Sequence, residues 1–511
     1  MKRHLVPSPS IERIALVSRR ASWVLSVTLS FATLTRVASA APDTPPPPNV
    51  VPAAPGAEDL LKRLRDRVAQ PGGLTSERVA RRAVQTSPED RSRAADVDSV
   101  AAEVTRSNVG YYPRLTLTAR YTRLSPITPP TLGTVAAPAD QTLSPRTPIT
   151  GPIVAFPVTF PVILDNYMLQ ANVTVPLSDY LLRIRQTHDA ALSSEEASAI
   201  TREATRRTVA AQAKLLYYSW ARVLMQQAVT EQSVEQSRRH LELARAGRDA
   251  GRMPEVEVLC AESAVASAEL LNERTTNAGI VAGERLRTLL HDESDAPYLI
   301  GEDLLAPLSP PPVDRPDALY GEALQKRPEM RAIDRSDSSL RQQRTAAQST
   351  GLPRLDAFGN GYVANPSPRV FPQREEWKAT WDVGVQLSWS PNDLGGEDAT
   401  TRSIDAGRRK LDAQRAAVKD AVRDEIRAAV VATREATVAA ETANRGLTAA
   451  EESYRVRREL FELGRATDVE LIDAETDVLR ARLEMIQARV DARVARVQLD
   501  HAVGRDALPS P

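Results

Sequence analysis

Glu470 and Asp473 are acidic side chains three residues apart in a segment free of helix breakers, so they share one face of the expected helix. Carboxylates on one face attract cations and repel anions, and such groups set ion selectivity where they line a pore. The alternative is a solvated helix face with Arg465 and Arg480 as neighbours, and the spacing alone favours that alternative.

Other chemistry finds no support in the 511 residues. A single cysteine, Cys260, excludes a disulfide framework or a cysteine-based zinc site, and the five histidines stand far apart in the sequence. We expect Cys260 to be a buried small side chain. No nucleophile elbow, phosphate-binding loop, HExxH sequence or glycine-rich dinucleotide motif occurs, so we expect no enzyme activity, no cofactor and no metal. The 66 basic and 66 acidic residues balance, which is not the charge of a nucleic-acid-binding protein.

The amino terminus is typical of a secretory signal peptide over residues 1–40. Arg19 and Arg20 precede the apolar run 23–31, and Ala38-Ser39-Ala40 follows as a small-residue cleavage sequence. The run is shorter than the roughly 20 residues of a spanning helix. Cleavage leaves 60 basic against 65 acidic residues. Because no cysteine lies at the cleavage point, we expect no amino-terminal lipid anchor.

The two halves of the chain share one plan. Residues 83–89 align with 323–329, which lie 240 positions later, whereas 250–259 align with 463–472, only 213 positions later. The Pro- and Thr-rich insert 125–161 accounts for the difference. This pattern predicts a Pro-rich leader with a short helix at 41–73, a first repeat at 74–291, a linker at 292–315, a second repeat at 316–505 and a short tail at 506–511.

Four segments alternate apolar and polar residues in the manner of half-buried strands, at about 113–124, 164–176, 353–364 and 379–390. Strands of about ten residues with one apolar face suit a transmembrane β-barrel. Trp377, Trp381 and Trp389 suit part of its aromatic girdle, and for Trp389 the alternative is packing at the junction of barrel and helices. We expect segment 125–163 to be an extracellular loop, because it joins two strands and its prolines prevent continued pairing.

The helices predicted after each strand pair are long. Residues 177–247 hold no internal Pro or Gly and would extend roughly 105 Å, and 395–464 would reach a similar length. Gly251 and Gly464 end these helices, and we expect both to adopt a left-handed C-cap before a return helix. Recurrent alanines permit close helix packing on two sides. The fold class expected is therefore mostly α with a small membrane β-barrel.

The segment 454–479 resembles the TolC family of bacterial outer-membrane efflux proteins, most specifically at 463–475 (LGRATDVELIDAE), which is similar to the family's periplasmic helix-turn-helix tip. Residues 327–330 and 351–355 also match its pattern, and the resemblance covers both repeats. It implies a homotrimer in which each subunit contributes four strands to a twelve-stranded barrel and long antiparallel helices to an α-barrel tunnel.

The resemblance also implies a function. Family members are exit ducts of tripartite efflux or type I secretion systems, and they dock onto an inner-membrane pump through a periplasmic adaptor. The expected location is the outer membrane of a Gram-negative cell, in contact with lipid, with a long periplasmic extension. The alternative is a periplasmic coiled-coil adaptor or scaffold, which would share the signal peptide and the helical hairpins but would lack paired strands before each long helix.

The resemblance assigns roles to particular residues. In family members an acidic pair near the tip narrows the closed tunnel, and Glu470 and Asp473 align with it, so that three subunits would place six carboxylates around the axis. In the first repeat Glu257 takes the Glu470 position, while a cysteine replaces Asp473. Phe461 aligns with an aromatic residue that latches the closed tip, although simple packing is the alternative. Gly251 and Gly464 are the expected tip hinges.

Overall fold

The computed structural model describes residues 57–127, 131–138, 152–159, 162–306, 308 and 315–506. The expected signal peptide, the leader up to residue 56 and tail residues 507–511 lie outside these ranges. No helix in the described ranges is long and apolar enough to cross a membrane.

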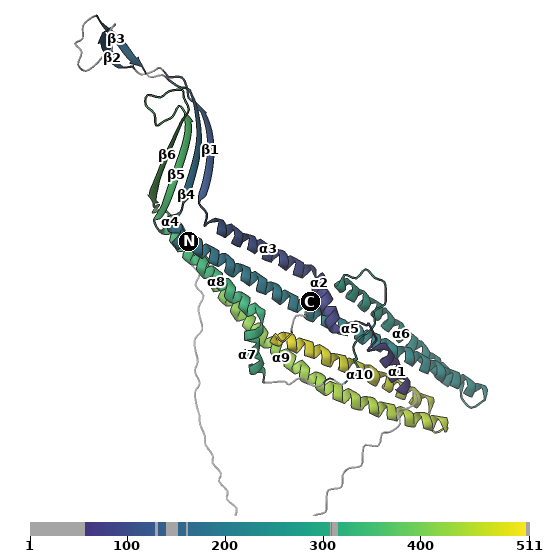
Figure 1. Cartoon of the computed structure of the whole chain (residues 1–511). Helices are drawn as coiled ribbons and strands as arrows, with labels where there is room; N and C mark the ends of the chain where they lie inside the picture. Colours follow the sequence, from purple (N-terminus) through teal and green to yellow (C-terminus); the bar gives the residue numbers. More distant parts are fainter. Residues whose placement is uncertain are drawn as a thin grey trace, which may run out of the picture. The chain divides into compact units, whose positions relative to one another are not determined.

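Each repeat contains two shorter helices, a pair of strands and two long helices (Figure 1). After α1 (Ala57–Arg67), the first repeat comprises α2 (Ser76–Thr86), α3 (Pro88–Val109), β1 (Arg114–Arg123), β4 (Asp165–Val175), α5 (Arg185–Asp249) and α6 (Glu255–Leu290). The second comprises α7 (Pro316–Lys326), α8 (Pro328–Gln348), β5 (Arg354–Asn365), β6 (Lys378–Ser388), α9 (Asp393–Glu462) and α10 (Asp468–Val503).

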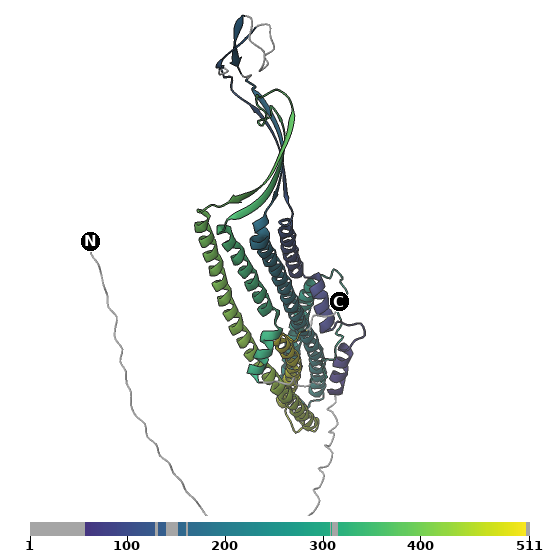
Figure 2. The same cartoon turned by 60° about the vertical axis from the view of Figure 1, so that its left-hand side comes forward.

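Short helical turns join the strands to the helices. The three-residue helix α4 (Leu177–Asp179) and a π-helical turn (Tyr180–Ile184) lead from β4 into α5, and a 3-10 turn (Ser349–Gly351) precedes β5. The 65 residues of α5 extend roughly 100 Å, so the turn that follows α5 lies far from the strands. Figure 2 shows α3, α5, α8 and α9 running alongside one another below the strands.

The same signals start the equivalent helices of both repeats. Pro88 and Pro328 stand at the first helical positions of α3 and α8, where the missing N–H of proline costs nothing. The Ser87 hydroxyl accepts a hydrogen bond from the Asp90 N–H at 3.2 Å and caps α3. No side chain caps α8, and Arg327 at that position serves another purpose described below.

The four strands form one antiparallel sheet in the order β1-β4-β5-β6, and their bounds lie within two residues of the ranges expected from the alternation. The register pairs Thr116 with Asn172, Asn172 with Asn360 and Asn360 with Asp382, so these polar residues share one face. The apolar residues lie on the opposite face, and several are largely exposed, among them Leu115, Leu117, Trp381, Val383, Val385 and Leu387.

The segment 125–163 differs from the unpaired loop expected. Its described residues form an antiparallel hairpin of β2 (Thr131–Pro138) and β3 (Ile153–Thr159). Pro138 pairs with Ile153 and Pro157 with Thr134, so the prolines do not prevent pairing. In a two-stranded sheet every strand has an open edge, and a proline is tolerated where its missing N–H would face that edge.

The main apolar core lies where the first repeat meets the linker and α10. Its largest fully buried side chains include Tyr217 and Met225 of α5, Leu286 of α6, Ile300 of the linker and Ile486 of α10. The parallel bridge between Leu74 and Ile300 ties the linker to the start of the repeat. A second core joins α7, α9 and α10 through Leu319, Ile426 and Leu499, among other residues.

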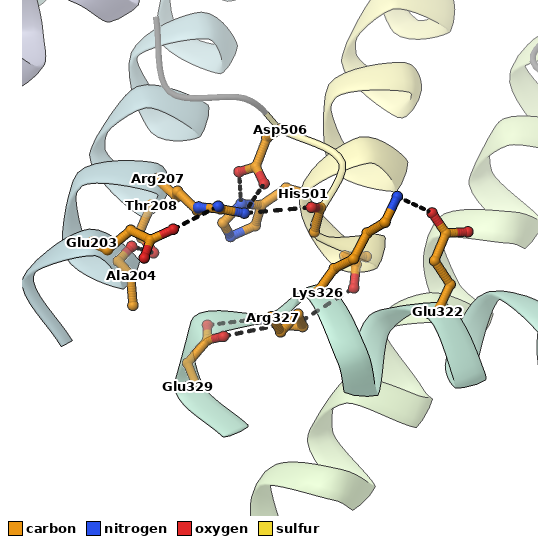
Figure 3. A network of polar contacts seen from close by, with 12 residues as sticks. Glu203, Ala204, Arg207, Thr208, Glu322, Lys326, Arg327, Glu329, His501 and Asp506 are labelled. Carbon is orange, nitrogen blue, oxygen red and sulfur yellow. Dashed lines mark hydrogen bonds and ion pairs between the residues drawn. The ribbon is translucent and has the colours of Figure 1, made fainter. Parts of the chain in front are cut away.

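A polar network holds the carboxyl end of α10 against both repeats (Figure 3). Gly504 ends α10 in the left-handed conformation, and beyond it Asp506 contacts His501 at 2.7 Å and Arg207 of α5 at 3.8 Å. Arg327 is buried between α7 and α8, pairs with Glu329 at 3.0 Å and Glu425 of α9, and donates to the Ala502 carbonyl. The network therefore joins α5, α8, α9 and α10.

We predict that Arg327→Ala destabilises the fold by roughly 1.5–3 kcal/mol, because it removes a buried guanidinium and its charge-assisted hydrogen bonds to two carboxylates. Burial alone would raise the pKa of Glu329, but the hydrogen bond and charge of Arg327 outweigh burial and lower the pKa. A lower apparent melting temperature of the detergent-solubilised protein is the readout. The control is Arg331→Ala, because Arg331 pairs with Glu203 at the surface and should contribute less than about 1 kcal/mol. Equal losses in the two variants would contradict the prediction.

Candidate functional site

The two interhelical turns are built alike. Gly251 and Gly464 have φ angles of +71° and +70°, so both adopt the left-handed conformation expected. At the first turn Arg252 N–H donates to the Gly247 carbonyl at 2.9 Å, and at the second Arg465 N–H donates to the Leu460 carbonyl at 2.8 Å. These are the bonds of a Schellman motif, in which only glycine avoids a steric cost at the left-handed position. Their role as hinges stays a prediction.

Glu470 has a structural task in addition to the one its sequence suggests. The Thr467 hydroxyl caps α10 by accepting from the Glu470 N–H at 3.3 Å, while the Glu470 carboxylate accepts from the Thr467 N–H at 2.8 Å. This reciprocal pair is a capping box. The hydrogen bond from the Thr467 backbone is the main reason that the pKa of Glu470 is lowered. In the single chain the cap therefore favours the ionised form of the Glu470 carboxylate.

The first tip has no equivalent cap. Pro254 takes the position of Thr467 and offers no side-chain hydrogen bond, so Glu257 is not engaged by a capping box. Glu257 is half-buried, whereas Glu470 and Asp473 are exposed on α10. No group of three His, Cys, Asp or Glu side chains among the described residues is placed to hold a metal ion.

A buried ion pair, not foreseen from the sequence, joins the two hairpins near their tips. His240 Nε2 of α5 lies 2.5 Å from Asp468 Oδ1, at the first residue of α10, and the two side chains are only 5% and 1% exposed. Burial by itself lowers the pKa of His240, but the adjacent carboxylate of Asp468, with those of Glu475 and Glu257 nearby, outweighs burial and raises the pKa. No sequence pattern reveals this pair, because its members belong to different repeats.

Phe461 lies beside this pair. Its ring centroid is 6.0 Å from that of His240, with the planes tilted by 49°. Phe461 lies in the last turn of α9, so this contact joins the hairpin of α9 and α10 to α5 of the first hairpin. The structure thus places Phe461 at a contact between hairpins, and its role as a latch stays a prediction.

A groove of about 480 Å³ lies between α5, α6 and α10. Its lining is mostly apolar, with hydroxyl groups from Ser233 and Ser237 on α5, Ser263 and Ser267 on α6, and Thr476 on α10. Cys260 also lines this groove and is exposed, so the expectation that it is buried is wrong. The physical reason is that α10 does not cover this part of α6.

Long antiparallel helices that continue from a four-stranded antiparallel sheet define a channel protein of the outer-membrane α-barrel and β-barrel class. The chain matches the outer membrane efflux protein family over residues 79–290 and 319–505, and it belongs to that family. The resemblance to the TolC family is thereby confirmed, as are the fold class and the function of an outer-membrane efflux channel.

Solved structures of channels share this fold. The outer-membrane channel OprN is 18% identical with a TM-score of 0.65, over 91% of this chain and 98% of that one. The outer membrane channel CmeC of Campylobacter jejuni is 14% identical with a TM-score of 0.64, over 88% of each chain. The outer membrane protein VceC of Vibrio cholerae is 16% identical with a TM-score of 0.63, over 84% of this chain and 96% of that one. No curated protein sequence matches this chain.

We predict that the contact between His240 and Asp468 makes the stability of the tip depend on pH. Because the folded pKa of His240 is raised, protonated His240 stabilises the fold fully below its unfolded pKa of about 6.5, and this contribution is lost as pH rises through the folded pKa. His240→Asn should therefore lower the apparent melting temperature at pH 6 and lower it less at pH 9.

The control for this experiment is His188→Asn, because His188 bonds the Ser107 hydroxyl and has no acidic partner among the described ion pairs. The melting temperature of this control relative to the unmodified protein should not depend on pH in the same way. A His240→Asn effect of equal size at both pH values would contradict the predicted titration.

Proposed function

We propose that the chain acts as a homotrimeric exit duct in the outer membrane, receiving substrate from an inner-membrane pump through a periplasmic adaptor. The observation that carries this proposal is the open sheet. Among the described residues β1 pairs with β4 alone and β6 with β5 alone, so both edges of the four-stranded sheet are unpaired there. Unpaired backbone groups are not tolerated in lipid, and closure of three sheets edge to edge satisfies them.

The surface of the sheet supports its placement in lipid. Leu117 of β1 is 74% exposed and Val383 of β6 is 72% exposed, which is costly in water. The ring centroids of Tyr121 and Tyr167 are 5.1 Å apart, and that of Trp377 lies 6.0 Å from Tyr167, so aromatic rings gather at the end of the sheet away from the helices. Trp389, at the opposite end, donates to the Gly351 carbonyl. Aromatic residues at both ends of an apolar band are typical of a membrane barrel.

The strands also favour the duct over a periplasmic adaptor or scaffold. An adaptor has no need of a sheet whose apolar face is exposed. The groove between α5, α6 and α10 instead offers a surface of small side chains that a helix of an adaptor can approach closely. We place the adaptor contact near the helix tips for this reason.

Glu470 and Asp473 are our candidates for the gate. Both are exposed on the first two turns of α10, and Asp473 has no ion pair among the described residues. Three subunits would bring the six carboxylates of Glu470 and Asp473 together around the axis, and Glu257 of the other hairpin would add three more. A ring of this kind admits cations in preference to anions and binds divalent cations.

We expect the mature chain to fractionate with the outer membrane and to migrate as a trimer until it is heated. The reason is that only a closed barrel satisfies the β1 and β6 edges in lipid. Membrane fractionation followed by electrophoresis of heated and unheated samples gives the measurement. Recovery as a monomer in the soluble periplasm would refute the proposed function.

We predict that Glu470→Gln combined with Asp473→Asn weakens cation preference and divalent block, while trimers still assemble. Glutamine at the third helical position preserves the capping box, so the double variant removes charge without removing the cap. Single-channel recordings in planar bilayers give the selectivity.

Thr467→Ala is the matched control for this experiment, because it removes the cap and leaves both carboxylates in place. We expect it to lower stability by about 1 kcal/mol and to leave cation preference unchanged. If the double variant keeps the divalent block of the unmodified channel, these carboxylates are no more than a solvated helix face.

A further inference from the structure

The loop between β5 and β6 folds back onto the sheet. Ala364, at the end of β5, and Ser367 of the loop are 2% and 3% exposed. The Ser367 hydroxyl accepts from the Arg369 N–H at 3.4 Å, and the Ser367 carbonyl accepts from the Val370 N–H at 3.3 Å. These contacts turn the chain back at the end of the sheet that is remote from the helices.

The turn brings one cation onto the polar face of the sheet. The Arg369 guanidinium forms an ion pair with Asp382 of β6, donates to the Trp381 carbonyl at 2.9 Å, and lies 5.0 Å from the centre of the Tyr362 ring. Tyr362 and Asp382 belong to the face opposite Trp381 and Val383. A closed barrel with its apolar face in lipid would therefore have Arg369 inside.

Asp382 in turn ends a line of hydrogen bonds across three strands. The Asn172 amide donates to Asn360 at 2.6 Å, and the Asn360 amide donates to Asp382 at 2.7 Å. This line fixes the height and orientation of the carboxylate in the barrel, because each member is held by its cross-strand neighbour. Arg369 is consequently held in place by the hydrogen-bonded strands of the sheet as well as by the loop.

We propose that Arg369 and Asp382 form a second selectivity element in the barrel lumen, at a distance from the helix tips. This proposal rests on the proposed trimeric duct. Three copies place three guanidinium groups and three carboxylates around one level of the lumen. The two charges compensate one another at this level of the lumen, so removing either one leaves the charge of the other uncompensated there.

The charge balance predicts that removing Arg369 and removing the charge of Asp382 shift the cation-to-anion permeability ratio in opposite directions. Arg369→Ala removes three cations and leaves three carboxylates facing the lumen, so it should raise the cation-to-anion permeability ratio by roughly twofold and raise conductance. Asp382→Asn leaves three guanidinium groups and should lower the ratio by a similar factor. A role confined to packing would not move selectivity in two directions.

The experiment uses full-length trimers in planar bilayers, with reversal potentials measured across a tenfold KCl gradient. Hexaamminecobalt(III) added only on the side of the β5–β6 loop should block Arg369→Ala at a concentration roughly tenfold lower than it blocks the unmodified channel. The matched control is Arg374→Ala, an exposed arginine of the same loop, which should change neither quantity. If Arg369→Ala fails to assemble, Asp382→Asn carries the test, because its amide keeps the shape of the carboxylate.

The outcomes separate the two proposals. Opposite shifts in Arg369→Ala and Asp382→Asn support the selectivity element. If both variants keep the cation-to-anion permeability ratio of the unmodified protein, or shift it in the same direction, the selectivity proposal is wrong and the proposed duct is unaffected. A wild-type protein that forms no channel would instead overturn the proposed function.

Discussion

A peptide group in hydrocarbon must find its hydrogen-bond partner within the protein, and the sheet of this chain leaves two rows of such groups without one. β1 and β6 are its open edges. In water an edge can be solvated, but the apolar face of the same strands argues for lipid. The single chain is therefore incomplete in lipid. Another copy of the same chain has the complementary edges and can pair with them.

The arrangement of the helices follows from that closure. β4 leads through one short helix and a π-helical turn into α5, and β6 leads into α9 after four residues. Each long helix therefore begins close to the end of a strand. If the strands close into a ring, the helices that follow them must form a ring as well. The burial of α9 agrees with this view, because its fully buried residues lie within one segment, from Val422 to Ala436, and the rest of the helix is half-buried or exposed in a single chain.

The sequence predicted what depends on periodicity and on local turn chemistry. Alternation located the four strands within two residues, and glycine located both left-handed turns. The sequence does not indicate the β2–β3 hairpin, because proline generally disfavours strand pairing. The open edges of a two-stranded sheet tolerate it. The sequence also missed the contact of His240 with Asp468 and that of Arg369 with Asp382. The path of a turn or loop decides both contacts, and neither helical nor strand periodicity carries that information.

The two ends of the molecule differ in what holds them. In the sheet, backbone hydrogen bonds and hydrogen bonds between side chains join neighbouring strands, so a change in one strand disturbs the next. At the tips, two hairpins meet through a buried ion pair and an aromatic contact, and each hairpin turns on a single left-handed glycine. Separating the hairpins at their tips breaks side-chain contacts and no backbone ladder. The proposed gate at the tips would therefore open without breaking the hydrogen bonds of the sheet.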